Sequence, residues 1–360
     1  GMVNSLVYDT TIDQFKAERT TPDSVEMQFY LSEMVKAKCE YAVIEVSSHA
    51  LMLNRVDNID LQIGLYTNFS RDHLDFHKSM ENYLEAKKLL LDKIAEKNSC
   101  AVVNQDVPEF VSMIDDYQSD VLSYSSAGNE ADIKIDAAKL SPTMSLFNLV
   151  MPDSSCEVWF NLPGRYNLAN AACAASAGVA LGIGKDNIKK GLESAKPVPG
   201  RYRPVILGQP FSVVIDYAHT PDALARLCLS AREITQGNIL TLFGCGGDRD
   251  SGKRPMMAEA ASTNSDFVIL TSDNPRTENP EKIFEETIPG MIDDNYEVIS
   301  DRSEAIRTII GRAKKDDTVL IAGKGAEDYQ EIGTTRFPFN DKKEIENALE
   351  AFGYKQVKAG

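Results

Sequence analysis

Residues able to bind a metal ion follow two apolar segments in the first part of the chain. Glu45 closes one segment, and Asp72, His73 and Asp75 follow the next. Carboxylates and an imidazole at neighbouring strand ends suit a divalent cation held beside phosphate groups. The alternative is structural, with Glu45 capping a helix and His73 satisfying a buried turn. Spacing by itself leaves both interpretations open.

A glycine-rich turn, GCGGDRDSGKR (244–254), follows another apolar segment. Its end nearly matches a phosphate-binding loop, but Arg254 stands where the magnesium-binding Ser or Thr belongs. Asp248 and Arg249 also break the dinucleotide-binding glycine pattern. We interpret the segment as a tight turn that aims Arg249 at an anion. The alternative is a surface turn with Arg249 in solvent.

Two further polar turns follow apolar segments, DNPR (273–276) and GKGAED (323–328). A guanidinium on a proline-stiffened turn suits bidentate recognition of a carboxylate, and Glu327 adds an anionic group. Turns that follow parallel strands meet at one edge of their sheet. The mixed charges at that edge predict a site for a zwitterion such as an amino acid.

The elements that must position these residues follow an α/β pattern. In the first part we expect strands at 41–46, 62–68 and 100–106, and helices at 22–37, at 80–97 and from about Asn167. Residues 120–162 contain short β segments and few helix signals, which predicts an antiparallel patch. Lys87 falls on the 80–97 helix, where a lysine ordinarily carries its charge into solvent.

The proline-rich segment KPVPGRYRPV (196–205) is the best candidate for a domain boundary. We therefore expect a first domain over 1–199 and a second over 200–360. The second has strand patterns at 212–218, 238–244, 266–272, 296–300 and 318–323, separated by helical stretches. The predicted fold class is α/β, with two doubly wound domains, the second of them Rossmann-like.

Composition narrows the function classes. A formal charge of −16 argues against nucleic acid as a partner, because phosphate backbones need a basic surface. The six cysteines form no Cys-x-x-Cys pair, which predicts reduced thiols in a cytoplasmic protein. The N-terminal residues lack the apolar core of a signal peptide, and the uncharged segment 166–184 contains Asn167 and Asn170, so we expect no membrane insertion.

Taken together, the motifs resemble those of the Mur ligases. The segments that carry the resemblance run in family order over nearly the whole chain: ERTTPDS (18–24), EVSSHAL (45–51), TNFSRDHLDFH (67–77), YLEAKKLL (83–90), LPGRYNLANAACA (162–174), VPGRY (198–202), DYAHTPDAL (216–224), FGCGGDRDSGKRP (243–255), SDNPRTENP (272–280) and GKGAEDYQ (323–330). Together these segments are specific for this family. The branch they resemble most adds the third residue of the peptidoglycan stem peptide.

The resemblance implies an ATP-dependent amide-bond ligase of cell-wall synthesis. In this family ATP phosphorylates a substrate carboxylate, and the amine of the incoming amino acid attacks the acyl phosphate, with Mg2+ neutralising charge during phosphoryl transfer. The implied substrates are UDP-N-acetylmuramoyl-L-alanyl-D-glutamate and meso-diaminopimelate. An arginine in DNPR goes with diaminopimelate in this family, because Arg276 can pair with a distal carboxylate that lysine lacks.

The resemblance also implies roles for individual residues. The implied catalytic and metal-binding residues are Glu45, His73 and Lys87, the last as a carbamate. Thr20, Thr21, Ser47 and Arg55 match positions that bind the muramoyl-peptide. Asn167, Asn170, Arg201, Asp216 and His219 match nucleotide contacts. Arg249, Asp273, Asn274, Arg276, Gly323 and Glu327 match the amino-acid site.

The chain departs from the family pattern in two places. Ala326 stands where the family has an imidazole. The family also carries a UDP-binding domain and a phosphate-binding loop before ERTTPDS, so we expect an incomplete central domain. We then expect no ligase turnover by this chain alone, and a separate N-terminal fragment carrying the loop as one possible partner. With that side of the pocket open, water would keep Lys87 protonated and at most partly carbamylated.

Three other interpretations remain. A folylpolyglutamate synthetase belongs to the same superfamily, although the EVSSH and DNPR motifs together favour the cell-wall branch. A nicotinamide-dependent oxidoreductase would need the dinucleotide-binding glycine pattern that the turn at 244–254 lacks. The last is a non-catalytic product, either a truncated protein or one half of a split enzyme.

Overall fold

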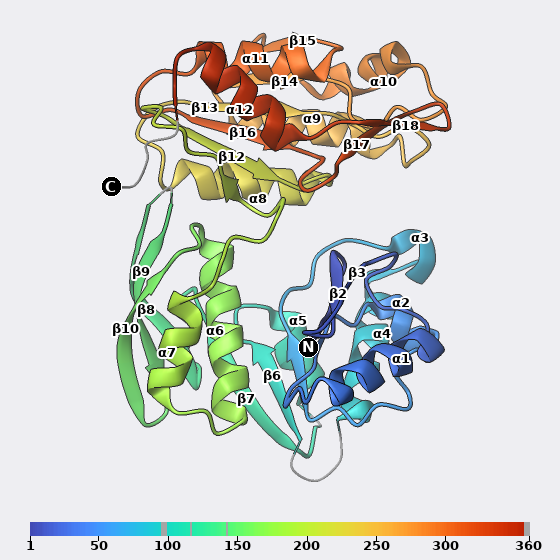
Figure 1. Ribbon diagram of the computed structural model, residues 1–360, viewed down its shortest axis with the longest axis vertical. Helices are drawn as coiled ribbons and strands as arrows, with labels where there is room; N and C mark the ends of the chain where they lie inside the picture. Colours follow the sequence, from blue (N-terminus) through green and yellow to red (C-terminus); the bar gives the residue numbers. More distant parts are fainter. Residues whose placement is uncertain (95–98, 116, 142, 356–360) are drawn as a thin grey trace. The chain divides into compact units, whose positions relative to one another are not determined.

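The computed structural model describes residues 1–94, 99–115, 117–141 and 143–355 (Figure 1). They form two compact units. The first comprises residues 1–135, 149–155 and 169–188, and the second comprises 136–148, 156–168 and 189–360. The single boundary expected near residue 200 stays a prediction.

A four-stranded sheet opens the first unit. Its strands are β1 (Met2–Val3), β2 (Val7–Asp9), β3 (Gln14–Lys16) and β4 (Val43–Ile44), in the order β3-β2-β1-β4. Only β1 and β4 pair in parallel. Helix α1 (Ser24–Lys36) begins with a capping box in which Asp23 and Glu26 satisfy backbone N–H groups, as the ERTTPDS segment allows. The first three strands were not predicted, because they are too short to show apolar alternation.

A second sheet contains β5 (Ile63–Tyr66), β6 (Cys100–Asn104), β7 (Asp120–Ser125), β8 (Ile133–Leu140), β9 (Ser145–Met151) and β10 (Ser154–Phe160), in the order β10-β9-β8-β7-β6-β5. Helices α2 (Ser48–Met52), α3 (Leu74–His77), α4 (Met80–Lys93) and α5 (Pro108–Met113) accompany these strands along the chain. The structure confirms the strands expected at 62–68 and 100–106. It also confirms the helix expected at 80–97, as far as residue 94, where the described residues are interrupted.

The antiparallel patch expected over 120–162 is wrong for β7, which pairs in parallel with both β6 and β8. A loop over 126–132 connects β7 to β8. Asp106, just after β6, accepts hydrogen bonds from the hydroxyl of Ser125 and from the backbone N–H groups of Ser126 and Ala127. This anchoring holds the loop at the end of β6 and lets β8 run in the same direction as β7.

Two helices follow these strands, α6 (Arg165–Ala180) and α7 (Lys185–Glu193). The helix expected from about Asn167 is thereby confirmed. No helix in the described part of the chain is long and apolar enough to cross a membrane.

A six-stranded sheet forms the centre of the second unit. Its strands are β11 (Arg203–Pro204), β12 (Ser212–Asp216), β13 (Ile239–Phe243), β14 (Phe267–Leu270), β15 (Tyr296–Val298) and β16 (Thr318–Ala322), in the order β11-β12-β16-β13-β14-β15. Four of the five pairings in this sheet are parallel, and only β11 pairs antiparallel, with β12. All five strands predicted in this half are confirmed.

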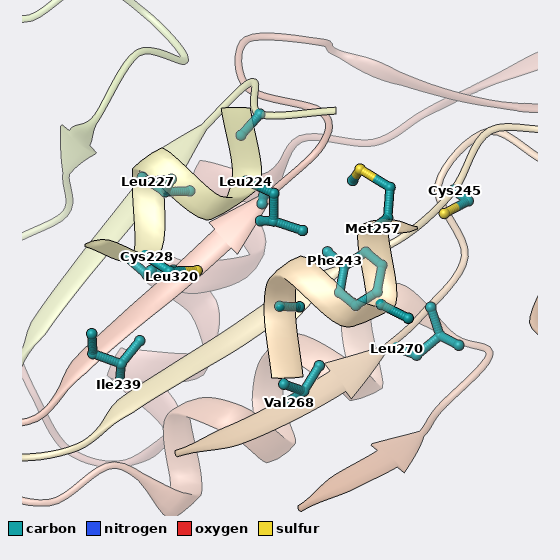
Figure 2. Packing of buried hydrophobic residues seen from close by; sticks show 14 of the residues in the cluster. Leu224, Leu227, Cys228, Ile239, Phe243, Cys245, Met257, Val268, Leu270 and Leu320 are labelled. Atoms are coloured by element: carbon teal, nitrogen blue, oxygen red, sulfur yellow. The ribbon is translucent and has the colours of Figure 1, made fainter. Parts of the chain in front are cut away.

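Helices cover both faces of this sheet. They are α8 (Pro221–Arg232), α9 (Lys253–Asn264), α10 (Pro280–Thr287), α11 (Arg302–Arg312) and α12 (Asp341–Ala351). Val214 packs into a core with α8, α9 and α10, whereas its neighbours Val213 and Ile215 pack into a core with α11 and α12. Figure 2 shows the first core around Phe243, Met257 and Leu320. In Figure 1, α8 and α11 lie on opposite sides of β12 and β16, as in a doubly wound fold.

Candidate functional site

The candidate substrate residues of the first unit meet at the turn after β4. The Thr21 hydroxyl donates to the backbone carbonyl of Glu45 at 2.8 Å, and the backbone N–H of Ser47 donates to Thr21 Oγ1 at 3.0 Å. Arg55 donates to the carbonyl of Thr21 at 2.9 Å. Ser47 then caps α2. Thr21, Ser47 and Arg55 are thus brought together, and Thr20 adjoins them in sequence.

Glu45 does not cap a helix, because Ser47 does so. Its Oε2 atom accepts a hydrogen bond from the backbone of Ser5 at 3.0 Å. The His73 ring lies 6.0 Å from the Tyr83 ring, and the Lys87 amine lies 4.9 Å from the centre of the same ring. His73 and Lys87 therefore share Tyr83 as a neighbour, and His73 is not the satisfied residue of a buried turn, since 44% of its side chain is exposed.

Magnesium requires several oxygen ligands in a defined arrangement. In the described ranges, no group of three or more His, Cys, Asp or Glu side chains lies where it could hold a metal ion. The side chain of Asp75 lies outside the described residues. The described side chains alone do not form a complete cation site, and a carbamate on Lys87 would add two oxygens to the set. The metal-binding role of Glu45, His73 and Lys87 stays a prediction.

The environment of Lys87 differs from the sequence-based expectation. Burial lowers the pKa of the Lys87 amine from its ordinary value of 10.5, and the charge of Asp72 acts in the opposite direction. Burial makes the neutral form less unfavourable than it is for a lysine in water. Only the neutral amine adds CO2, so this direction is the one that carbamate formation requires. The modified state itself stays a prediction.

We expect Lys87→Met to raise the melting temperature of the chain at pH 7. The pKa of Lys87 is lower in the folded chain than in the unfolded chain. At a pH below both pKa values the amine is protonated in both states, and because the folded chain binds that proton less tightly, the free energy of unfolding is reduced. As pH rises past 10.5, the unfolded chain loses this proton as well and the cost fades. Calorimetry from pH 7 to pH 11 should therefore show a gain that shrinks as pH rises. Lys88→Met, at an exposed position, is the control. An equal gain at every pH would contradict the prediction.

The candidate nucleotide residues fall into two groups. Asn167 and Asn170 lie on α6, and Asn167 donates to the carbonyl of Pro163 at 2.7 Å. Arg201 and His219 both lie against Tyr217, the guanidinium 5.0 Å and the imidazole 4.6 Å from the ring.

Asp216 precedes Tyr217 in the chain. Its carboxylate accepts hydrogen bonds from the backbone of Tyr202 and Ala218, at 2.7 and 2.8 Å. Burial nevertheless raises the pKa of this carboxyl group. The structure thus brings Arg201, Asp216 and His219 together at the carboxyl end of β12.

A pocket of about 200 Å³ lies at the carboxyl ends of the parallel strands. Loops after β12, β13, β14 and β16 line it with Tyr217, His219, Gly244, Cys245, Gly246, Arg249, Lys253, Asp273, Asn274, Arg276, Gly323 and Glu327. The lining includes every residue that the resemblance places at the amino-acid site, together with His219. Arg249 lines this pocket, is exposed and donates to the Asp248 carbonyl at 3.0 Å, so the anion-binding interpretation of its turn stays a prediction.

Hydrogen bonds within the pocket wall hold the DNPR turn in place. Arg276 donates to the carbonyl of Gly247 at 2.7 Å and lies 3.3 Å from the carboxylate of Glu331. Its backbone is left-handed, with φ 51°, and its N–H donates to the Glu331 carbonyl at 3.0 Å. Arg276 is therefore oriented before any ligand arrives. Gly323 has φ 110°, and a Cβ there would lie 2.6 Å from Asp273 Oδ2, so the site needs glycine at this position.

Glu331 belongs to a hairpin that the sequence analysis missed. Its strands are β17 (Tyr329–Ile332) and β18 (Thr335–Pro338), joined through Gly333 with φ 61°. Gln330 donates to the Asp273 carbonyl at 2.8 Å, and the Glu331 N–H donates to Asn274 Oδ1 at 2.9 Å. The short apolar alternation in YQEIGTTRFP was the available signal, but only the contacts show that the hairpin positions the DNPR turn.

Arg254 has a structural role. Its side chain is 1% exposed and forms ion pairs with Glu278 at 2.8 Å and Glu286 at 2.5 Å. It also donates to the carbonyl of Gly246 at 3.3 Å, while Glu278 accepts from the backbone N–H of Asp248 at 2.5 Å. Arg254 therefore links the glycine-rich turn to the segment after DNPR. It stands at the position where a phosphate-binding loop has its magnesium-binding Ser or Thr.

Comparison with known proteins agrees with this arrangement. The Mur ligase middle-domain model matches residues 2–178, and the Mur ligase glutamate ligase domain model matches residues 200–325. A UDP-N-acetylmuramoyl-L-alanyl-D-glutamate–2,6-diaminopimelate ligase of Clostridium acetobutylicum is 40% identical over 346 residues, covering 95% of this chain and 70% of that protein. The chain belongs to the Mur ligase family.

Solved structures agree with this assignment. A UDP-N-acetylmuramoyl-L-alanyl-D-glutamate–2,6-diaminopimelate ligase aligns with a TM-score of 0.67 at 36% identity, covering 96% of this chain and 72% of that one. A MurF ligase from Thermotoga maritima, solved with ADP, aligns with a TM-score of 0.65 at 18% identity, covering 92% of this chain and 72% of that one, and so supports the fold alone.

Mur ligases are ATP-dependent amide-bond ligases of peptidoglycan synthesis, and this Mur ligase shares their α/β architecture. Family membership decides against the nicotinamide-dependent oxidoreductase considered from the sequence. The six cysteines carry free thiols, as expected.

Proposed function

We propose that this Mur ligase joins meso-diaminopimelate to UDP-N-acetylmuramoyl-L-alanyl-D-glutamate through an acyl phosphate. Two relatives with this activity are 40% and 39% identical to the chain over 346 and 354 residues. The finer assignments are part of the proposal: the diaminopimelate specificity, the individual ligand contacts, and Mg2+ as the second cofactor.

The observation that carries the proposal is the charge pattern of the pocket at the ends of β12, β13, β14 and β16. Arg249, Lys253 and Arg276 supply cations, while Asp273 and Glu327 supply carboxylates. An amino acid with a carboxylate and an ammonium group at each end complements such a mixture. Lysine has no second carboxylate, so it would form fewer charge-assisted hydrogen bonds with these cationic groups.

The residues around Tyr217 fit the nucleotide. Arg201 can pair with a phosphate, the Tyr217 ring offers a stacking surface, and His219 reaches both this group and the pocket lining. ATP supplies the phosphoryl group that activates the substrate carboxylate. The chain's own part is to hold the attacking amine in the pocket beside the activated carbonyl, which lowers the entropic cost of the reaction.

Isothermal titration calorimetry on the 360-residue chain tests the proposal. We expect meso-diaminopimelate to bind at least about tenfold more tightly than L-lysine, a preference of about 1.4 kcal/mol. The two ligands share one amino-acid end and differ at the other, so the ratio reports on the distal group. Equal binding of both ligands, tighter binding of lysine, or no binding of diaminopimelate would overturn the proposal.

A further inference from the structure

A buried lysine stands directly behind the amino-acid pocket. Lys324 follows Gly323 in the turn after β16, and its side chain is 0% exposed. The ammonium donates to Asn274 Oδ1 at 2.9 Å and to Glu327 Oε2 at 3.3 Å, and it lies 3.9 Å from Asp273 Oδ1. A buried charge is tolerated only with such partners, and all three partners here line the pocket.

Lys324 and the backbone N–H of Glu331 together fix which way the Asn274 amide points. Asn274 Oδ1 accepts from both Lys324 and the backbone N–H of Glu331, and both donors need an oxygen. The amide nitrogen must then face the other way, where it donates to Glu327 Oε2 at 2.9 Å. A reversed amide would place its NH2 group against the ammonium. Lys324 therefore holds Glu327 in two ways, directly and through Asn274.

Glu327 is held at one oxygen and open at the other. Its Oε2 atom accepts from both Asn274 and Lys324, while the side chain remains 22% exposed to the pocket. This leaves Oε1 as the acceptor that can face a ligand. Lys324 also offsets the charge of Asp273 and Glu327, which are the two carboxylates in the pocket lining. Without it, the carboxylates would repel each other and Glu327 could rotate.

We propose that Lys324 is a positioning residue for amino-acid recognition: it orients Asn274 and Glu327 so that Glu327 presents one oxygen to an ammonium group of the incoming amino acid. Lys324 itself lies outside the pocket lining and acts through its neighbours. The inference rests on the proposed function, because it assumes that an amino acid with an ammonium group occupies this pocket.

A double-mutant cycle on the 360-residue chain tests this role, with meso-diaminopimelate as the probe in calorimetric titrations. We expect Lys324→Met, which keeps the length of the side chain and removes its charge, to weaken binding by about tenfold or more. In a Glu327→Gln background the same change should cost less than about threefold, since the group through which Lys324 acts has already been altered. A lysine with a purely structural role would weaken binding by the same factor in both backgrounds.

Lys342→Met is the matched control. Lys342 also pairs with a glutamate, Glu346 at 2.8 Å, but on the exposed face of α12, so its replacement should leave binding unchanged. Thermal melting of each variant shows whether the chain remains folded at the titration temperature. Equal affinities of wild type and Lys324→Met, or equal losses in both backgrounds, would overturn the inference while the proposed function stands. Absence of diaminopimelate binding by the wild type would overturn both.

Discussion

Replacing Asp341 with alanine is expected to destabilise the second unit by about 3–5 kcal/mol, the usual cost of removing one partner from a buried ion pair. Arg302 and Asp341 are both 0% exposed, and two hydrogen bonds of 2.8 Å join them. Arg302 NH1 already lacks a hydrogen-bond partner. Asp341→Ala would leave a buried guanidinium with only the Ala322 carbonyl, at 3.0 Å, as a close acceptor.

Native-state hydrogen exchange can measure this loss within the intact chain. Backbone amides of α11 and α12 should exchange roughly a hundredfold faster or more in Asp341→Ala, since about 1.4 kcal/mol corresponds to a factor of ten. The pair replacement Arg302→Met with Asp341→Leu is the control, because it removes both charges and should cost much less. If Asp341→Ala exchanged like the wild type, or the pair replacement were the more damaging, the ion pair would not stabilise this unit as argued.

Arg276→Ala is expected to weaken meso-diaminopimelate binding by at least about tenfold, since loss of one partner of a desolvated charge pair costs about 2–5 kcal/mol. Arg276 is held by Gly247 and Glu331, and a guanidinium has further N–H donors that a ligand carboxylate can use. Its backbone geometry and the hairpin contact orient those donors before binding. L-lysine has no distal carboxylate, so its binding should change much less.

Calorimetric titration of both ligands against both proteins decides this prediction. Arg336→Ala is the matched control. Arg336 lies in the hairpin that contacts Arg276, with its guanidinium 4.3 Å from the centre of the Tyr329 ring, but it does not line the pocket. Its removal should leave the affinity for diaminopimelate unchanged. Equal losses for diaminopimelate and lysine in Arg276→Ala, or no loss for either, would remove Arg276 as the specificity residue.

Much of the second unit could be predicted from sequence because its strands are continuous apolar runs. Such runs arise when both faces of a parallel strand are buried, as for β13 and β16. The turns after them then had to meet at one edge, and the structure places their polar residues in one pocket. In the first unit the signals were weaker, and the short strands β1 to β3 and the parallel direction of β7 were not foreseen.

The polar contacts of the site could not be predicted from the sequence to the same extent. Lys324 was noticed only as part of a glycine-rich turn, and a lysine is ordinarily expected in solvent. Arg254 was interpreted as a failed phosphate-loop residue, yet it is buried between Glu278 and Glu286. Apart from Glu327, which lies three residues after Lys324, the partners of both residues are distant in sequence, so no local pattern could identify them.

The sequence by itself determined the α/β class, the apolar strands of the second unit and the polar turns that follow them, while the assignment of those turns to an amino-acid site came from the family resemblance and stays a prediction. It could do so because burial periodicity and turn chemistry are local properties that neighbouring residues record. Only the tertiary structure decided that Lys324 directs Asn274 and Glu327, that the hairpin from Tyr329 to Pro338 fixes the DNPR turn, and that burial lowers the pKa of Lys87. These properties depend on distances and desolvation between segments far apart in the chain, which exist only once the chain is folded.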